Sequence, residues 1–420
     1  MVKSKRKNAD GQIKVAIGCQ GGGMHAAFAV GVLTKILRDL KERKGAGDKT
    51  GFKLVGLSGT SAGALCALMV WYGLAPKGKK FGGGSEQEAI DKLNSFWDDF
   101  VAKDAAETVL NFLTYRTFWL EELEVPRIGV NAPIFGRLNP YGGLLKAVTA
   151  SLPSLGVRKQ YFDLEKLLAE ACPALDNNSI DWKNVTTRLL IGASEVRHGF
   201  ETVFDSDVKK TGQLENEGMQ RPKELKGKAR YWRQRLPLSL SGIAASGTLP
   251  ILRKAEQIGH FHYWDGLYAH NPPVREFIAD TKEVPDELWI VRINPQQWPY
   301  VPRKNKDIQD RQNELMGNLS LNKELDFIMS VNDWQDRYKD ERFGKEHKPV
   351  VVRTIKMDED VARDLSYSSK FDRSPDRMND LRKQGERTAE NWLDKWHEDK
   401  ASSYPEDAGY YKRESDEIIE

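Results

Sequence analysis

Residues 52–72 read Phe-Lys-Leu-Val-Gly-Leu-Ser-Gly-Thr-Ser-Ala-Gly-Ala-Leu-Cys-Ala-Leu-Met-Val-Trp-Tyr, which is two apolar runs around a short turn. The turn fits G-x-S-x-G, in which a serine sits on a sharp connection between a strand and a helix. Gly59 stands where a Cβ would crowd the turning backbone, and Gly63 where the helix must approach the neighbouring strand closely. The stretch therefore predicts a strand, a tight turn that carries Ser61, and a helix.

A glycine-rich segment earlier in the chain has the same context. Residues 18–24 read Gly-Cys-Gln-Gly-Gly-Gly-Met, after an expected strand at 14–18 and before an expected helix at 24–40. Backbone N–H groups at the start of a helix bind negative charge. The segment lacks the Gly-Lys-Ser/Thr ending of a P-loop and does not match G-x-G-x-x-G. Two such loops after parallel strands lie at the edge of a sheet where ligands bind. They predict a nucleophile beside an oxyanion site.

A serine nucleophile also needs a proton acceptor. Residues 260–273 read His-Phe-His-Tyr-Trp-Asp-Gly-Leu-Tyr-Ala-His-Asn-Pro-Pro, a strand-like run followed by an Asp-Gly turn signal. Asp265 could accept the proton itself, in a dyad. Alternatively, His262 or His270 accepts it while a carboxylate orients the ring, in a triad. Reasoning from these residues leaves both models open.

Taken in order, these segments resemble the patatin-like phospholipases. The family pattern is Gly-Gly-Gly, then Gly-x-Ser-x-Gly, then Asp-Gly-Gly or Asp-Gly-Ala; here the last is Asp265-Gly266-Leu267. Residues 244–250 (Ala-Ala-Ser-Gly-Thr-Leu-Pro) are similar to the stretch before the family's aspartate, and Asn271-Pro272-Pro273 to the Asn-Pro after it. The resemblance extends over residues 12–295.

The resemblance implies an α/β protein with the three-layer patatin-like fold, in which a mostly parallel central sheet has helices on both faces. It implies a Ser–Asp dyad, with Ser61 as nucleophile and Asp265 as base. The backbone N–H groups of Gly21, Gly22, Gly23 and Met24 would form the oxyanion hole. The expected reaction is hydrolysis of fatty-acyl esters of phospholipids or lysophospholipids through an acyl-enzyme, without a metal ion or organic cofactor.

The chain departs from the family pattern at three places. Met24-His25-Ala26 stands where the family commonly has x-Arg-Gly, so a fixed cation is missing near the oxyanion loop. His25 either replaces part of that arginine, as an auxiliary residue, or has no chemical role. Gln20 replaces an Asp or Ser, and Leu267 replaces a small residue. The missing arginine motivates a third hypothesis, a non-catalytic lipid-binding or regulatory module, beside the dyad enzyme and a triad esterase for soluble esters.

Composition bounds the remaining possibilities. The chain has 420 residues, of which 30% are charged and 40% apolar, and a net charge of +3. So small a net charge predicts no nucleic-acid partner. Three scattered cysteines indicate neither a disulfide framework nor a metal site, which favours the reducing cytoplasm. We expect a cytoplasmic protein with peripheral membrane contact and a lipid-ester substrate. The sequence does not indicate its oligomeric state.

The order of elements suggests one catalytic domain and an extension. Strands are expected at 188–196, 201–204 and 288–293, with a polar loop at 206–235 and a short helix at 236–245. Alternating strands and helices indicate a mostly parallel sheet. We expect a disordered N-terminus (1–11), a catalytic domain (12–300), a mainly helical C-terminal extension packed on it (301–400), and a polar tail (401–420). Within the extension, helices are expected at 306–340 and 375–396, and a strand at 350–355 that joins the same sheet. Residues 105–123 form an aromatic, amphipathic stretch that is either a lid or membrane-contact surface near the acyl site, or core-facing.

Overall fold

The computed structural model describes residues 12–47, 51–76, 82–122, 163–207, 233–250, 253–279, 284–298 and 300–405. Its centre is a nine-stranded sheet in the order β5-β4-β3-β2-β1-β8-β9, with β7 also paired to β3 and β6 to β7. The strands are β1 (Ile13–Cys19), β2 (Phe52–Thr60), β3 (Arg188–Glu195), β4 (Glu201–Asp205), β5 (Arg233–Pro237), β6 (Glu256–Ile258), β7 (Phe261–Asp265), β8 (Glu287–Arg292) and β9 (Val351–Lys356).

The sheet is mixed but mostly parallel. The pairs β1–β2, β1–β8, β2–β3, β4–β5 and β8–β9 are parallel, whereas β3 runs antiparallel to β4 and β7. The central strands β1, β2 and β8 are buried along most of their length, because a parallel sheet is covered on both faces. The predicted α/β fold with a mostly parallel central sheet is confirmed.

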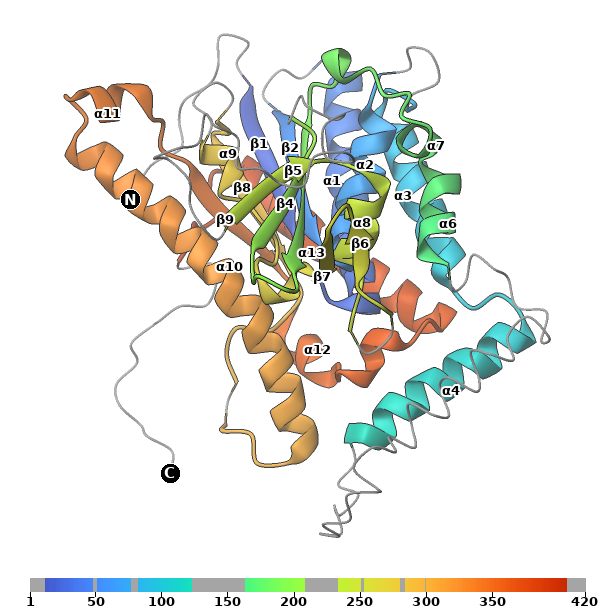
Figure 1. Ribbon diagram of the computed structural model, residues 1–420. Coiled ribbons are helices and arrows are strands. Elements are labelled where there is room, and N and C mark those ends of the chain that lie inside the picture. Colours follow the sequence, from blue (N-terminus) through green and yellow to red (C-terminus); the bar gives the residue numbers. More distant parts are fainter. Residues whose placement is uncertain are drawn as a thin grey trace.

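Helices cover both faces of the sheet (Figure 1). One apolar core joins the sheet to α1 (Ala27–Gly45), α2 (Ala62–Leu74), α3 (Glu86–Phe100), α8 (Leu240–Ser246) and α13 (Pro375–His397). A second core joins the opposite face to α9 (Glu276–Ala279) and α10 (Asn305–Arg337). The other helices are α4 (Ala105–Glu122), α6 (Leu164–Ala171), α7 (Pro173–Asp176), α11 (Arg342–Glu346) and α12 (Glu359–Asp364). Short 3-10 helices are η1 (Gly23–Ala26), η6 (Trp182–Asn184), η8 (Gly266–Tyr268) and η9 (Ser368–Phe371).

Residues after 300 are built into the same layers. β9 pairs with β8 in parallel, as expected for a strand that would be unstable alone. α13 packs along α1, and the backbones approach so closely that a Cβ on Gly31 would lie 2.0 Å from the carbonyl oxygen of Arg382. The expected long helix is present as α10. The boundary at residue 300 stays a prediction.

Two expectations were wrong in detail. Residues 233–235, expected in a polar loop, and 236–237, expected in a short helix, instead form β5, which pairs in parallel with β4. The charged residues of β5 are typical of a loop, but Arg233 forms ion pairs with Glu276 and Glu324. The short helix expected at 236–245 begins only at Leu240, because Ser239 caps it through a hydrogen bond from the N–H of Gly242. The sequence also predicts a helix at 141–173, of which residues 141–162 lie outside the described residues, as do 1–11 and 406–420 of the expected termini.

Candidate active site

Ser61 occupies the predicted sharp turn between β2 and α2. Its φ of 57° and ψ of −130° lie in a region that non-glycine residues rarely adopt, so the backbone is strained there. Neighbouring backbone atoms leave no room for a side chain at either flanking glycine. A Cβ on Gly59 would lie 2.3 Å from the carbonyl oxygen of Gly63, and one on Gly63 would lie 2.3 Å from that of Cys19 in β1. The turn therefore presents the serine at the end of the strand, as the sequence predicts.

The glycine loop lies directly against this turn. A Cβ on Gly21 would lie 2.8 Å from the Cβ of Ser61 and 2.6 Å from the carbonyl oxygen of Thr60. The N–H of Gly21 donates to Oδ1 of Asn271 at 2.6 Å. Here the structure differs from the expectation, because this N–H is already used and is not an oxyanion donor. Gly21 instead supplies the space that lets the two loops meet.

The other N–H groups of the expected oxyanion hole stand at a helix start. Gly22 precedes η1, and Gly23 and Met24 form its first residues, after which the chain continues into α1. N–H groups in a first helical turn lack acceptors within the helix. Gly23 has a φ of +57°, which suits glycine. The loop therefore offers the N–H groups of Gly22, Gly23 and Met24, but not that of Gly21.

The pairing of β7 with β3 places Asp265 near Ser61. Thr60 of β2 is opposite Gly192 of β3, and the next residue of β3, Ala193, is opposite Asp265 at the end of β7. The carboxylate therefore lies beside the residue that follows Thr60, which is Ser61. Gly266 is required by this packing, since a Cβ there would lie 2.5 Å from the carbonyl oxygen of Gly192.

The Asp265 carboxylate is buried and only partly satisfied. Its Oδ1 accepts a hydrogen bond from the N–H of Leu267 at 2.8 Å. Its Oδ2 is buried and has no hydrogen-bond partner within the described part of the chain. Burial raises the pKa of Asp265 to about 6, and the Ser61 side chain is the strongest influence that lowers it. The hydroxyl and the carboxylate thus interact across a short gap, and such contacts often tighten only when substrate binds.

The histidines of the triad model point elsewhere. His270 is buried, and its Nε2 lies 2.8 Å from the carbonyl oxygen of Thr202. Burial lowers the pKa of His270, with a further lowering from Arg233. His262 lies three residues before Asp265 in β7, and side chains alternate along a strand, so it lies on the opposite face. Neither ring is brought to Ser61.

His25 does not replace the missing arginine as a cation. Its Nε2 lies 2.7 Å from the Oγ of Ser369 in η9. Burial lowers the pKa of His25 well below its usual range, and Lys370 and Arg377 lower it further. The ring is therefore neutral near pH 7 and joins the oxyanion loop to η9.

The other departures from the family pattern also contact residues beyond 300. Gln20 is buried; its Nε2 donates to Oδ1 of Asn318 at 2.9 Å, and its Oε1 accepts from the N–H groups of Ile293 and Asn294. The side chain of Leu267 lies beside Gly317, at which an added Cβ would be 3.1 Å from it. Both Asn318 and Gly317 belong to α10. The three departures are thus the positions at which the site meets α10 and η9.

Ser61 and Asp265 line a small cavity of about 40 Å³. Sequence reasoning missed five of its walls, which are Leu249, Asn313, Tyr367, Lys370 and Phe371. Four of these come from α10 and the η9 segment, far along the chain from the motifs. The only indication in the sequence was the absent arginine, which suggests that another residue supplies a cation near the oxyanion loop. The sequence does not indicate which residue that is. A volume of this size holds about one water molecule, so an acyl chain does not fit wholly inside it.

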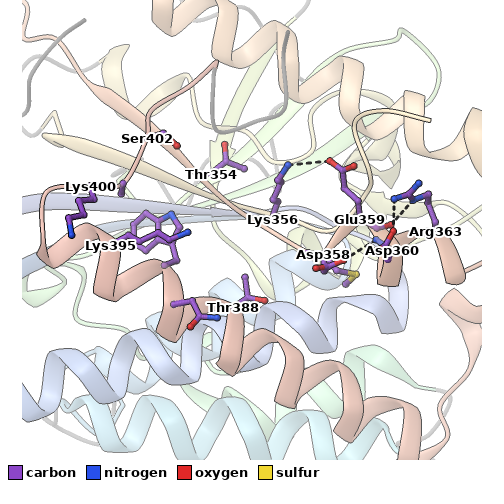
Figure 2. Close-up of a pocket in the computed structure, with 14 residues that line it drawn as sticks. Thr354, Lys356, Asp358, Glu359, Asp360, Arg363, Thr388, Lys395, Lys400 and Ser402 are labelled. Atoms are coloured by element: carbon purple, nitrogen blue, oxygen red, sulfur yellow. Dashed lines mark hydrogen bonds and ion pairs between the residues drawn. The ribbon is translucent and has the colours of Figure 1, made fainter. Parts of the chain in front are cut away.

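A larger cavity of about 830 Å³ lies between β9, α12 and α13 (Figure 2). Two ion pairs lie in its wall, Lys356 with Glu359 at 3.2 Å and Arg363 with Asp360 at 2.7 Å. It contains neither Ser61 nor Asp265. Among the described residues, no cluster of His, Cys, Asp and Glu side chains is arranged to hold a metal ion. Nor does any helix in the described ranges have the length and apolar character that a membrane span requires.

The α/β fold, the strained serine and the buried carboxylate beside it define the class of site. A model of the family described as patatin-like phospholipase matches residues 19–278, which is more than half of the chain. The chain therefore belongs to the patatin-like phospholipase family, whose members are lipid acyl hydrolases. No curated protein is similar enough to the chain to count as a match.

Solved structures give more distant likenesses. The chain is 13% identical to VipD from Legionella pneumophila, with a TM-score of 0.36, over 94% of this chain and 72% of that one. It is 12% identical to a chain of the heterodimeric ExoU–SpcU complex from the type III secretion system of Pseudomonas aeruginosa. That likeness has a TM-score of 0.27 and covers 90% of this chain and 52% of the other. Likeness at this level carries no argument about activity.

Proposed function

We propose that the chain hydrolyses fatty-acyl esters of phospholipids or lysophospholipids through an acyl-enzyme on Ser61, with Asp265 as general base. Family membership supports the reaction class. The observation that carries the mechanism is the buried Asp265 carboxylate beside the strained Ser61, with its pKa raised to about 6. A base with a pKa near the working pH is effective in proton transfer.

The chemistry takes two half-reactions. In the first, the Ser61 Oγ bonds to the ester carbonyl carbon while its proton passes to Asp265. The tetrahedral oxyanion accepts hydrogen bonds from the N–H groups of Gly22, Gly23 and Met24. The C–O bond to the alcohol breaks, and that oxygen takes the proton from Asp265. In the second, water gives a proton to Asp265 and attacks the acyl carbon, and the serine oxygen leaves with that proton as the fatty acid is released.

The triad alternative has less support. His270 faces the carbonyl oxygen of Thr202, and His262 lies on the other face of β7. A dyad enzyme should therefore tolerate the loss of either ring if it still folds. His262→Ala is the cleaner test, since His270 is fully buried and its removal leaves a cavity.

Exposed apolar side chains support action at a lipid surface. On α4, Val109 and Phe112 are 58% and 54% exposed, while Leu110 on the same helix is buried. α4 packs against η9, one wall of the cavity. The aromatic stretch therefore uses one side for packing and keeps another open, as suits a helix that rests on a membrane interface.

The test is fatty-acid release from phospholipid vesicles by the native chain, Ser61→Ala and Asp265→Asn. We expect release by the native chain and its loss in both variants, with circular dichroism showing that all three remain folded. Release by folded Ser61→Ala would rule out this nucleophile. Cleavage of soluble short-chain esters without release from vesicles would keep the mechanism and move the substrate away from membranes. Inactivity toward both substrates would favour a non-catalytic module.

A further inference from the structure

Lys370 of η9 packs closely against the oxyanion loop. A Cβ on Gly23 would lie 2.5 Å from the carbonyl oxygen of Lys370 and 3.0 Å from its Cβ. His25, two residues after Gly23, lies 2.7 Å by its Nε2 from the Oγ of Ser369, the residue before Lys370. Two contacts on neighbouring residues thus fix the position of Lys370 relative to the glycine loop.

Lys370 lines the Ser61 cavity and also a smaller neighbouring cavity with Asp310 and Glu314, and its side chain ends in an ammonium group. It donates one hydrogen bond to Oδ1 of Asn313 in α10. An ammonium group has three donors, and among the described residues Lys370 forms no ion pair with a carboxylate. Donors therefore remain for a ligand in the cavity that Lys370 lines with Ser61 and Asp265.

The carboxylates near Lys370 are engaged elsewhere. Asp310 accepts the N–H of Tyr367 at 2.5 Å, and Glu314 accepts the indole N–H of Trp298 at 2.7 Å. Both act on Lys370 through space, as does Asp265. The direct hydrogen-bond partner of Lys370 is therefore the neutral amide of Asn313, and the acids act only at longer range. The amide holds the ammonium group in place without neutralising its charge.

We propose that the Lys370 ammonium group binds an anionic phosphate oxygen of the substrate close to the scissile ester, so that the site prefers phosphate-bearing lipid esters over neutral glycerides. The proposal rests on the proposed function and adds its substrate-binding residue. It also accounts for His25 in place of the family's arginine. The cation comes from η9, and a second cation in the loop would repel it.

A matched pair of soluble substrates tests this directly, because 1-hexanoyl-glycerol 3-phosphate and 1-hexanoyl-glycerol differ only in the phosphate. We expect Lys370→Met to lower kcat/KM for the phosphate ester by roughly 10- to 100-fold, the loss of one charge-assisted hydrogen bond. The loss with the neutral ester, which has no phosphate for Lys370 to bind, should be smaller, so the readout is the ratio of the two kcat/KM values in the variant and in the native chain. Lys370→Arg should retain the preference, and Lys383→Met, at an exposed lysine of α13, should match the native chain.

Equal losses with both substrates would overturn the proposal, since Lys370 would then act on the reacting atoms or on folding. Unchanged rates with both would overturn it as well. A binding measurement separates this from failure of the proposed function. Calorimetry with Ser61→Ala and Ser61→Ala/Lys370→Met uses the same two ligands without turnover. Tighter binding of the phosphate ester, lost in the double variant, supports the proposal even if the native chain hydrolyses neither ester; equal binding by both variants refutes it.

Discussion

At the scale of single residues, Asp265 must be buried to have a useful pKa and yet ionised to act. Burial raises its pKa from 3.8 to about 6. The base form of Asp265 therefore predominates only above this pKa. We expect kcat/KM for a neutral ester to rise with pH, to be half-maximal near pH 6, and to stay level above it. A pH profile of the native chain measures this, and a rate that is constant from pH 5 to 8 would exclude Asp265 as the base.

The same pKa predicts an effect on stability. The folded state binds the Asp265 proton more tightly than the unfolded state, so stability falls as pH rises from about 4 to 6. Two pKa units correspond to roughly 3 kcal/mol. Asp265→Asn should therefore be more stable than the native chain at pH 8, by up to about that amount, and equal to it near pH 3. Urea unfolding at both pH values measures the difference; a less stable variant at pH 8 would contradict the burial cost.

At the scale of elements, the turn between β2 and α2 depends on close backbone contact. Gly63→Ala would bring a Cβ within 2.3 Å of the Cys19 carbonyl oxygen in β1. We expect a loss of about 2–3 kcal/mol, as in overpacked cores, together with loss of hydrolysis. Gly51→Ala is the matched control before β2, since its nearest neighbour would be 3.8 Å away. Urea unfolding of both variants checks this, and similar midpoints would show that α2 can shift freely.

The contact of the Asp265 turn with α10 makes another element-scale prediction. Leu267 narrows the cavity and lies beside Gly317 of α10. Leu267→Ala should widen the cavity and raise the kcat/KM for long-chain esters relative to short-chain ones several-fold. It should also cost about 1–2 kcal/mol, because the side chain is only partly buried. Leu319→Ala, at an exposed position of α10, is the control. An unchanged chain-length preference would show that Leu267 does not limit the acyl site.

The elements that local patterns specify were predictable, and those that distant contacts specify were not. Glycine spacing around Ser61 and the Asp-Gly signal at Asp265 are local, and the structure brings both segments to one edge of the sheet. By contrast, β5 was missed, because charged residues such as Arg233 are typical of loops. In the structure Arg233 forms ion pairs with Glu276 and Glu324, which allow it to lie in a strand. The sequence predicted the N–H of Gly21 as an oxyanion donor, but in the structure this N–H donates to Oδ1 of Asn271. Both outcomes depend on residues far away in the sequence.

At the scale of the whole molecule, α1 and α13 join the two ends of the described chain. Gly31→Ala would place a Cβ 2.0 Å from the Arg382 carbonyl oxygen and force the helices apart. We expect a loss of about 3 kcal/mol. kcat/KM should fall as well, because η9 lies just before α13 and would shift with it. Gly45→Ala in α1, with nothing within 4 Å, should do neither. Normal kinetics in a destabilised Gly31→Ala variant would separate the helix contact from the site.

The contact between Gly23 and Lys370 also has a consequence for the chain while it is being made. Roughly 300 positions separate Ser61 from Lys370. At 5–20 residues per second, the ribosome needs roughly 15–60 s to travel from the first to the second. Throughout that interval the nascent chain carries its serine and glycine loop but lacks the η9 wall of the cavity. The cavity around Ser61 therefore gains its η9 wall only after residue 371 has been synthesised.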